Sequence, residues 1–349
     1  MAISTKKPGA GEDLTAGVLC DARGERVSLE TILMSNLHVV TGAFGYSGKY
    51  IARGLLARGC EVATLTNSPD RPNEFGGRIR VAPLAFADRA ALVASLEGAT
   101  VLYNTYWVRF DHRDFTHAAA VKNTQELFAA AKAAGVERIV HVSITNPSPE
   151  SKLPYFAGKA RLEAALRETG IPHSILRPAV LFGGEDILIN NIAWSLRRMP
   201  VFGLFGGGTH GLRPIHVEDF AALAIAEGQA EGCRTVDAVG PESFTLRELV
   251  ATLGQIIGKP RPMMSVPPAL GLLAGRLVGL LKRDVFLTKE EITALMAGLL
   301  ESKAPATGTI RLSEWAKQNK ETLGREYASE MRRRRKRDVA YRDEATGRP

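Results

Sequence analysis

The sequence has few cysteines and no cluster of metal-ligand residues. Among 349 residues there are three cysteines, Cys20, Cys60 and Cys233, which lie far apart along the chain. An odd number of widely spaced cysteines suits neither a disulfide framework nor a metal site, so we expect a reducing compartment. Histidine, cysteine and carboxylate residues nowhere adopt a metal-ligand spacing, and we predict no bound metal.

Membrane spans and export signals are also lacking. No apolar run reaches the ~18 to 20 residues that a bilayer span requires. The first residues, MAISTKKPGAGEDLTAG, have no apolar signal-peptide core and contain acidic residues, which are unusual in a transit peptide. With the reduced cysteines, these absences predict a cytoplasmic protein.

Positive charge is abundant but concentrated in one place. The formal net charge is +8, and the run RRRRKR at residues 332–337 contributes six of these charges. Blocks of like charge repel one another and seldom pack. We therefore expect residues 326–349 to form a basic, disordered tail that can be deleted from residue 331 without affecting folding or ligand affinity. We predict no specific nucleic-acid partner; the alternative is a tail that binds an anionic surface or nucleic acid.

What the sequence does contain is a repeated alternation of strand-like and helix-like segments. The strand-like segments are 37–42, 61–67, 79–88, 99–107, 137–145 and 173–183, and the helix-like segments between them are 47–59, 89–98, 116–135 and 154–170. Such alternation is typical of a parallel sheet covered by helices on both faces. The strands are apolar without alternation, as burial on both faces requires. We predict a doubly wound α/β domain over 37–183.

The remaining segments flank this domain. Residues 1–36 are polar and form an N-terminal extension. After Gly183 the rhythm breaks into glycine-rich loops and helices, which predicts a smaller α-rich substrate lobe over 184–325, with the chain crossing back to the sheet. Within it, Asn190, Asn191 and Arg213 offer polar contacts to a substrate.

Three glycines stand between the first strand and the first helix. Gly42, Gly45 and Gly48 are three residues apart in HVVTGAFGYSGKYIARG. The first permits a tight turn, the second lets the backbone approach a pyrophosphate, and the third lets the helix pack on the strand. Amides at the helix start then face the anion. The pattern predicts a dinucleotide in a Rossmann-type domain.

The end of the second strand bears on which dinucleotide is bound. An NAD site usually has an acidic residue there, to hold the ribose hydroxyls. This chain has Thr66, Asn67 and Ser68, followed by Asp70 and Arg71. Neutral hydrogen-bonding groups beside Arg71 tolerate a 2′-phosphate, so NADP(H) is slightly favoured over NAD(H).

A second informative stretch is HVSITNPSPESKLPYFAGKA, residues 141–160. Tyr155 and Lys159 are four apart at the start of a helix and project from one face, and Ser143 closes the preceding strand. A phenol has a pKa near ~10. A neighbouring ammonium stabilises the phenolate, and a serine hydroxyl can hold a substrate carbonyl. The alternative is that Tyr155 is a surface residue and Lys159 a solvated charge.

These motifs resemble the short-chain dehydrogenase/reductase superfamily. TGAFGYSG is similar to the glycine fingerprint of its extended and atypical branches, and YFAGK and Ser143 are similar to its tyrosine–lysine pair and serine. VKNTQELF resembles the helix whose asparagine, here Asn123, supports the lysine through a water. ILRPAVLFG and RPIHVEDFA resemble markers of the extended branch. The resemblance covers about residues 37–300 and is closest to the NmrA-like proteins and the dehydrogenase-fold accessory subunit of mitochondrial complex I.

The resemblance implies an NAD(P)-dependent oxidoreductase or epimerase that acts on a small-molecule substrate. Its catalytic residues would be Ser143, Tyr155, Lys159 and Asn123. Its cofactor-binding residues would be Gly42, Phe44, Gly45, Tyr46, Gly48, Thr66, Asn67, Arg71, Asn104, Tyr155, Lys159 and Pro178. Several atypical members bind NADP(H) but have lost the tyrosine, so the alternative is a non-catalytic sensor or complex-assembly subunit.

Two further features leave alternatives open. Tyr103, Tyr106 and Trp107 end the fourth strand, where they would narrow the nicotinamide site, stack on a planar substrate or pack in the core. The segment PPALGLLAGRLVGLLKRD has glycines at 271, 275 and 279, which give a helix a flat side. We expect this helix to pack within the protein or at a dimer face, in a monomer or homodimer. The alternative is peripheral membrane contact, with nearby basic residues at the headgroups.

Overall fold

The computed structural model describes residues 18–20, 26–28 and 36–335, and the chain divides into two compact units, residues 1–36 and 37–349. In the first unit, the described residues form β1 (Val18–Cys20) and β2 (Arg26–Ser28). These two strands pair antiparallel, with Leu19 opposite Val27.

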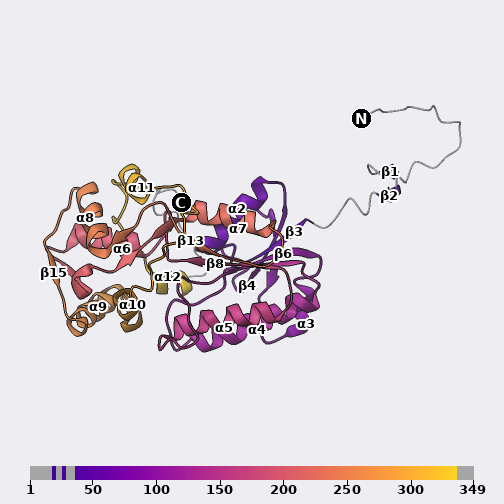
Figure 1. Ribbon diagram of the computed structural model, residues 1–349, viewed down its shortest axis with the longest axis horizontal. Helices are drawn as coiled ribbons and strands as arrows, with labels where there is room; N and C mark the ends of the chain where they lie inside the picture. The colour runs from indigo at the N-terminus through magenta and orange to yellow at the C-terminus, as the bar shows by residue number, and fades with distance from the viewer. Residues whose placement is uncertain (1–17, 21–25, 29–35, 336–349) are drawn as a thin grey trace, which may run out of the picture. The chain divides into compact units, whose positions relative to one another are not determined.

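A seven-stranded parallel sheet forms the centre of the second unit (Figure 1). Its strands are β3 (Leu37–Thr41), β4 (Glu61–Thr66), β5 (Ile79–Pro83), β6 (Ala99–Asn104), β7 (Arg138–Val142), β8 (His173–Pro178) and β13 (Arg234–Ala238). Their order is β13-β8-β7-β6-β3-β4-β5. The chain therefore runs outward from β3 to β5, returns to β6 beside β3, and runs outward to the other edge. This confirms the predicted doubly wound, Rossmann-type α/β fold.

Helices cover both faces of the sheet (Figure 1). On one face lie α2 (Tyr46–Ala57) and α7 (Val217–Gly228), and on the other lie α3 (Arg89–Ala94), α4 (His117–Ala133) and α5 (Pro154–Glu168). All five residues of β3 are buried. Val40 belongs to the core under α2 and α7, and Val39 belongs to the core under α3, α4 and α5. A strand buried on both faces has no polar alternation, which explains the apolar pattern of the sequence.

A smaller, mainly helical lobe follows the sheet. Its helices are α6 (Leu188–Arg198), α8 (Leu246–Ile256), α9 (Pro268–Lys282), α10 (Lys289–Met296) and α11 (Leu312–Gln318), with a short 3-10 helix η1 (Phe205–Gly208). Short strands join its segments in pairs: β9 (Val180–Phe182) with β12 (Pro214–His216), β10 (Phe202–Leu204) with β15 (Met263–Ser265), and β11 (Gly211–Leu212) with β14 (Phe244–Thr245). Leu196, Leu249 and Trp315 belong to its apolar core.

The glycine face of α9 packs inside the protein, and its leucine face is exposed. Gly275 and Gly279 are the buried residues of α9. A Cβ at Gly271 would overlap the ring of Phe205, so close packing requires glycine there. Leu280 and Leu281, by contrast, are 79% and 82% exposed. In the described part of the chain, no helix has the length and apolar character needed to cross a membrane.

The segment expected to begin a disordered tail is part of the fold. Residues 330–335 form α12 (Glu330–Arg335), in which Met331 is 4% exposed. The Asp284 carboxylate accepts hydrogen bonds from the backbone nitrogens of Glu330 and Met331, at 3.1 and 3.0 Å. The prediction is therefore wrong for residues 326–335, because nearby carboxylates and Met331 anchor the basic run. Residues 336–349 lie outside the described residues.

Candidate functional site

The glycine turn holds the start of α2 close to the end of β3. Gly42 has a φ of 69°, in the left-handed region that favours glycine. Its amide donates to the Leu65 carbonyl at 3.1 Å, and its carbonyl accepts from the Gly45 amide at 2.8 Å. A Cβ at Gly48 would overlap the Gly42 carbonyl, so the third glycine lets the helix pack against the turn. The start of α2 thus points to the carboxyl edge of the sheet.

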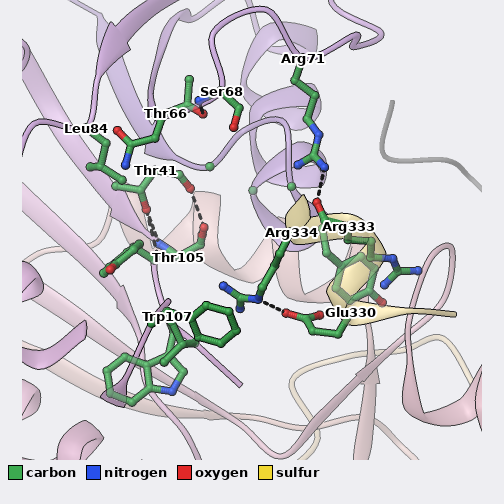
Figure 2. A pocket seen from close by; sticks show the side chains of 18 of the residues that line it. Thr41, Thr66, Ser68, Arg71, Leu84, Thr105, Trp107, Glu330, Arg333 and Arg334 are labelled. Carbon is green, nitrogen blue, oxygen red and sulfur yellow. Dashed lines mark hydrogen bonds and ion pairs between the residues drawn. The ribbon is translucent and has the colours of Figure 1, made fainter. Parts of the chain in front are cut away.

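A cavity of about 700 Å³ lies against this turn. It occupies the point where the strand order reverses, between β3 and β6, which is where ligands of doubly wound sheets bind. Seven of the predicted cofactor residues line it: Gly42, Gly45, Tyr46, Gly48, Thr66, Asn67 and Arg71. Figure 2 shows Thr66, Ser68 and Arg71 around the cavity, together with Thr105 and Trp107.

Three other predicted cofactor residues, Phe44, Asn104 and Pro178, do not line the cavity and contact protein groups instead. Phe44 is buried against Phe75, with ring centroids 6.2 Å apart. Asn104 is fully buried, and its Oδ1 accepts from the Thr41 hydroxyl at 3.2 Å. The Pro178 carbonyl accepts from the Thr145 amide at 3.1 Å. In this conformation these residues shape the strand ends and do not face the cavity.

Trp107 lines the cavity and also contacts the tyrosine–lysine pair. Trp107 lines the cavity, whereas Ser143, Tyr155 and Lys159 are not among its lining residues. The Lys159 Nζ lies 4.3 Å from the centroid of the Trp107 ring, and the Tyr155 ring meets that ring edge-on at 5.5 Å. Of the other predicted aromatics, Tyr106 lines the cavity and Tyr103 is buried in the core.

The predicted catalytic residues are engaged with protein groups. Lys159 Nζ donates to the Val142 carbonyl at 2.6 Å, and burial lowers its pKa to about 7. Burial raises the pKa of the Tyr155 hydroxyl, the opposite of what the predicted phenolate requires. The Ser143 hydroxyl donates to Glu163 at 2.6 Å, and Asn123 Nδ2 donates to the Tyr106 hydroxyl at 3.0 Å.

Sequence reasoning missed Glu163, which holds Ser143. Arg177 donates two hydrogen bonds to its carboxylate, at 2.9 and 2.5 Å. Burial raises the pKa of Glu163, but the bonds from Arg177 and Ser143 outweigh it and lower the pKa overall. Glu163 follows Lys159 by one helical turn, and that spacing is a signal that was available in the sequence.

Asn190 and Asn191 hold protein backbone. Asn191 exchanges two hydrogen bonds with the backbone of Ala328, both at 2.9 Å. Asn190 Nδ2 donates to the Glu326 carbonyl at 2.9 Å. These asparagines were expected to offer polar contacts to a substrate, and in this structure they anchor the segment before α12.

A buried acidic turn lies behind the start of α2. Glu185 forms a buried ion pair with Lys49, and the Tyr46 hydroxyl donates to the Gly183 carbonyl at 2.7 Å. Asp186 Oδ1 accepts from the amides of Ile189 and Asn190, at 2.7 and 3.2 Å. Burial raises the pKa of Asp186 to about 7. Among the described residues, no group of histidine, cysteine and carboxylate side chains is arranged to hold a metal ion.

Comparison with known proteins shows what this chain is similar to. Residues 42–191 match a family model described as NAD(P)H-binding. A mitochondrial protein of Arabidopsis thaliana, NADH dehydrogenase [ubiquinone] 1 alpha subcomplex subunit 9, is 28% identical over 62% of this chain and 57% of its own length. A second relative is a Streptomyces griseus protein named (4-alkanoyl-5-oxo-2,5-dihydrofuran-3-yl)methyl phosphate reductase. It is 28% identical over 64% of this chain and 74% of its own length. The match thus spans less than two thirds of the Arabidopsis relative.

Solved structures agree on the fold. Triphenylmethane reductase of Citrobacter sp. superposes with a TM-score of 0.67 over 80% of this chain and 98% of its own, at 18% identity. This chain therefore contains an NAD(P)H-binding domain with an oxidoreductase- and epimerase-like fold. It is consistent with the atypical, NmrA-like branch of the short-chain dehydrogenase/reductase superfamily, and the predicted resemblance is confirmed. That reductase has been solved with NADP(H), and a Brucella ovis epimerase of the same fold with NAD, so fold does not select the cofactor.

Proposed function

We propose that this chain binds NADP(H) in the cavity and acts as a non-catalytic dinucleotide-binding protein, a sensor or a subunit of a larger complex. The observation that carries the proposal is the position of Trp107. Its ring lines the cavity and packs against Lys159 and Tyr155, neither of which lines the cavity. With the tryptophan there, a dinucleotide on the glycine turn contacts the indole before it reaches the phenol or the ammonium.

The surroundings of the pair support the same conclusion. A working acid–base tyrosine needs its pKa moved toward neutrality. Here burial raises the pKa of Tyr155, and the Lys159 Nζ donates to the Val142 carbonyl. Ser143, the expected carbonyl-orienting group, donates a hydrogen bond to Glu163. The relatives named as subunits of NADH dehydrogenase or of NADH-ubiquinone oxidoreductase fit a role within a complex.

The preference for NADP(H) rests on the end of β4. Thr66, Asn67 and Ser68 are neutral, and Arg71 lines the cavity beside them. A guanidinium suits a 2′-phosphate, whereas the ribose hydroxyls of NAD are usually held by a carboxylate.

A second candidate function is an NAD(P)-dependent oxidoreductase or epimerase with Tyr155 as acid and base. It is favoured by the clustering of Tyr155 and Lys159 around one indole ring, since a rotation of Trp107 would open both to the cavity. The reductase relative from Streptomyces griseus supports it too.

Binding and turnover measurements separate these functions. We expect the wild type to quench or enhance NADPH fluorescence on binding, and Gly45→Leu to abolish binding, because a side chain there blocks the approach of the pyrophosphate. We also expect aldehydes, quinones and nucleotide sugars to give no turnover that depends on Tyr155. Turnover that falls by ~10²-fold in Tyr155→Phe, the scale of a positioned general acid, would favour the oxidoreductase. Absence of NADPH binding by the wild type would refute the first function, and absence of both NADPH and NADH binding would refute both.

A further inference from the structure

The C-terminal strap, residues 326–335, forms one wall of the cavity. Arg333, Arg334 and Arg335 line it together with the glycine turn and the start of α2. Arg71 Nη2 donates to the Arg333 carbonyl at 2.5 Å, so the strap contacts the end of the sheet near the predicted ribose site. Figure 2 shows this bond and the side chains of Arg333 and Arg334 next to the cavity.

The strap is anchored at several points. Asn191 exchanges hydrogen bonds with Ala328, and the Asp284 carboxylate caps the backbone of Glu330 and Met331. The Tyr327 hydroxyl donates to Asp284 at 2.9 Å. These bonds come from α6 and from the turn after α9, so the arginines are presented to the cavity from a fixed base.

The side chain of Arg334 is also positioned. Its Nε donates to Glu330 at 2.5 Å, and its guanidinium carbon lies 4.5 Å from the centroid of the Phe115 ring. Both Glu330 and Phe115 line the cavity. An arginine that is stacked on a ring and paired with a carboxylate is pre-organised, which reduces the entropy lost when it contacts a ligand.

The charge of the cavity suits an anion with several phosphate groups. Arginines at 71, 333, 334 and 335 line it, against the carboxylates of Asp114 and Glu330. Arg333 lines the same cavity as Tyr46 and Gly48 at the start of α2, and its backbone carbonyl accepts a hydrogen bond from Arg71. Guanidinium groups bind phosphate oxygens with strong, directional hydrogen bonds.

We propose that Arg333 and Arg334 of the strap bind the phosphate groups of the dinucleotide, so that the cofactor is held between the glycine turn and the C-terminal strap. This inference rests on the proposed NADP(H) binding and adds a second set of phosphate ligands from the far end of the chain. Binding of the dinucleotide would in turn hold the strap against the sheet.

The test is a fluorescence titration of the full-length chain with NADPH. The double variant Arg333→Gln/Arg334→Gln should weaken binding by about tenfold or more, because it removes two charge-assisted hydrogen bonds. Arg332→Gln is the matched control: it removes a neighbouring charge whose side chain is exposed and is not among the lining residues. That control should bind within about twofold of the wild type.

Each outcome has a distinct meaning. Failure of the wild type to bind NADPH would refute the proposed function itself. Wild-type binding together with equal affinity in the double variant and in Arg332→Gln would refute the strap inference alone, and tighter binding by the double variant would also contradict it.

A measurement on the unmodified protein guards against misfolding of the variants. Trypsin cleaves after arginine, so saturating NADPH should slow cleavage after Arg333 and Arg334 when fragments are followed by mass spectrometry. Cleavage at an unchanged rate would overturn the inference.

Discussion

Trp107 follows the end of β6, and two residues of α5 position its ring. Gly158 leaves space for it, since a Cβ there would lie 3.0 Å from Trp107 Cη2. Lys159 places its Nζ over the indole face, a contact worth about 0.5–2 kcal/mol when the amine is protonated. The indole therefore has favourable contacts on the side away from the cavity, and these contacts oppose the rotation that would expose Tyr155.

Asp186 provides a prediction at the same scale. Burial raises its folded pKa to about 7 from 3.8, while the backbone amides of Asn190 and Ile189 lower it. Because the folded pKa is the higher one, its contribution to stability is full below pH ~4 and is lost as pH rises through ~7. The wild type therefore carries an unfavourable buried charge at pH 8.

We expect Asp186→Asn to remove this dependence, since the amide keeps an oxygen acceptor for the two backbone amides but does not ionise. The melting temperature of the variant minus that of the wild type, measured without cofactor, should rise between pH 5 and pH 8. A difference that stays constant across that range would show that Asp186 is not a buried acid with a raised pKa.

At the scale of elements, α9 has an exposed apolar face. Leu273, Leu277 and Leu281 are all more than half exposed, and the basic residues Arg276 and Lys282 lie beside them. Leucines flanked by cations suit the surface of a membrane that contains anionic lipid.

We expect the wild type to sediment with phosphatidylglycerol vesicles and Leu277→Gln/Leu281→Gln to lose this binding. The stability of the variant should change by no more than about 0.5 kcal/mol, because the leucines are exposed. Val81→Gln, which alters an exposed apolar residue on β5, is the control. Equal sedimentation of all three proteins, or of none, would contradict a membrane-facing α9.

Elements with a strong sequence pattern could be predicted, and elements without one could not. The six predicted strands and the helices between them alternate regularly along the chain, and the glycine turn is a local motif with a defined backbone. The short strands of the lobe, such as the two-residue strands β11 and β14, have too few residues to show a period. The strap was missed because its contacts with Asp284, Asn191 and Arg71 join residues that are far apart in the sequence.

The same distinction applies to the candidate site. The residues that line the cavity as predicted come from two contiguous segments, 42–48 and 66–71. The contact of Trp107 with Lys159 joins the segment after β6 to α5, and no spacing in the sequence predicts it. The spacing of Tyr155 and Lys159 predicted that they share a helix face, and both contact Trp107. The spacing could not predict that this face packs against an indole ring.

At the scale of the molecule, much of the positive net charge lies in the run at 332–337, and we propose that part of this run binds the cofactor. Four of the six charges in the run at 332–337 lie on α12, at residues 332–335, and three of those four line the cavity. The position of these arginines beside the glycine turn fits the proposed binding of phosphate groups there. The cytoplasmic localisation and the monomer-or-homodimer state stay predictions.

The most direct test of the account is the affinity of Lys159→Met for NADPH, compared with that of the wild type by fluorescence titration. Methionine keeps an apolar stem of similar length behind Trp107 and removes the ammonium. If the indole separates Lys159 from the dinucleotide, the two dissociation constants should agree within about twofold, while Gly45→Leu does not bind. A loss of about tenfold or more in Lys159→Met would mean that the ammonium contacts the cofactor, and would contradict the account.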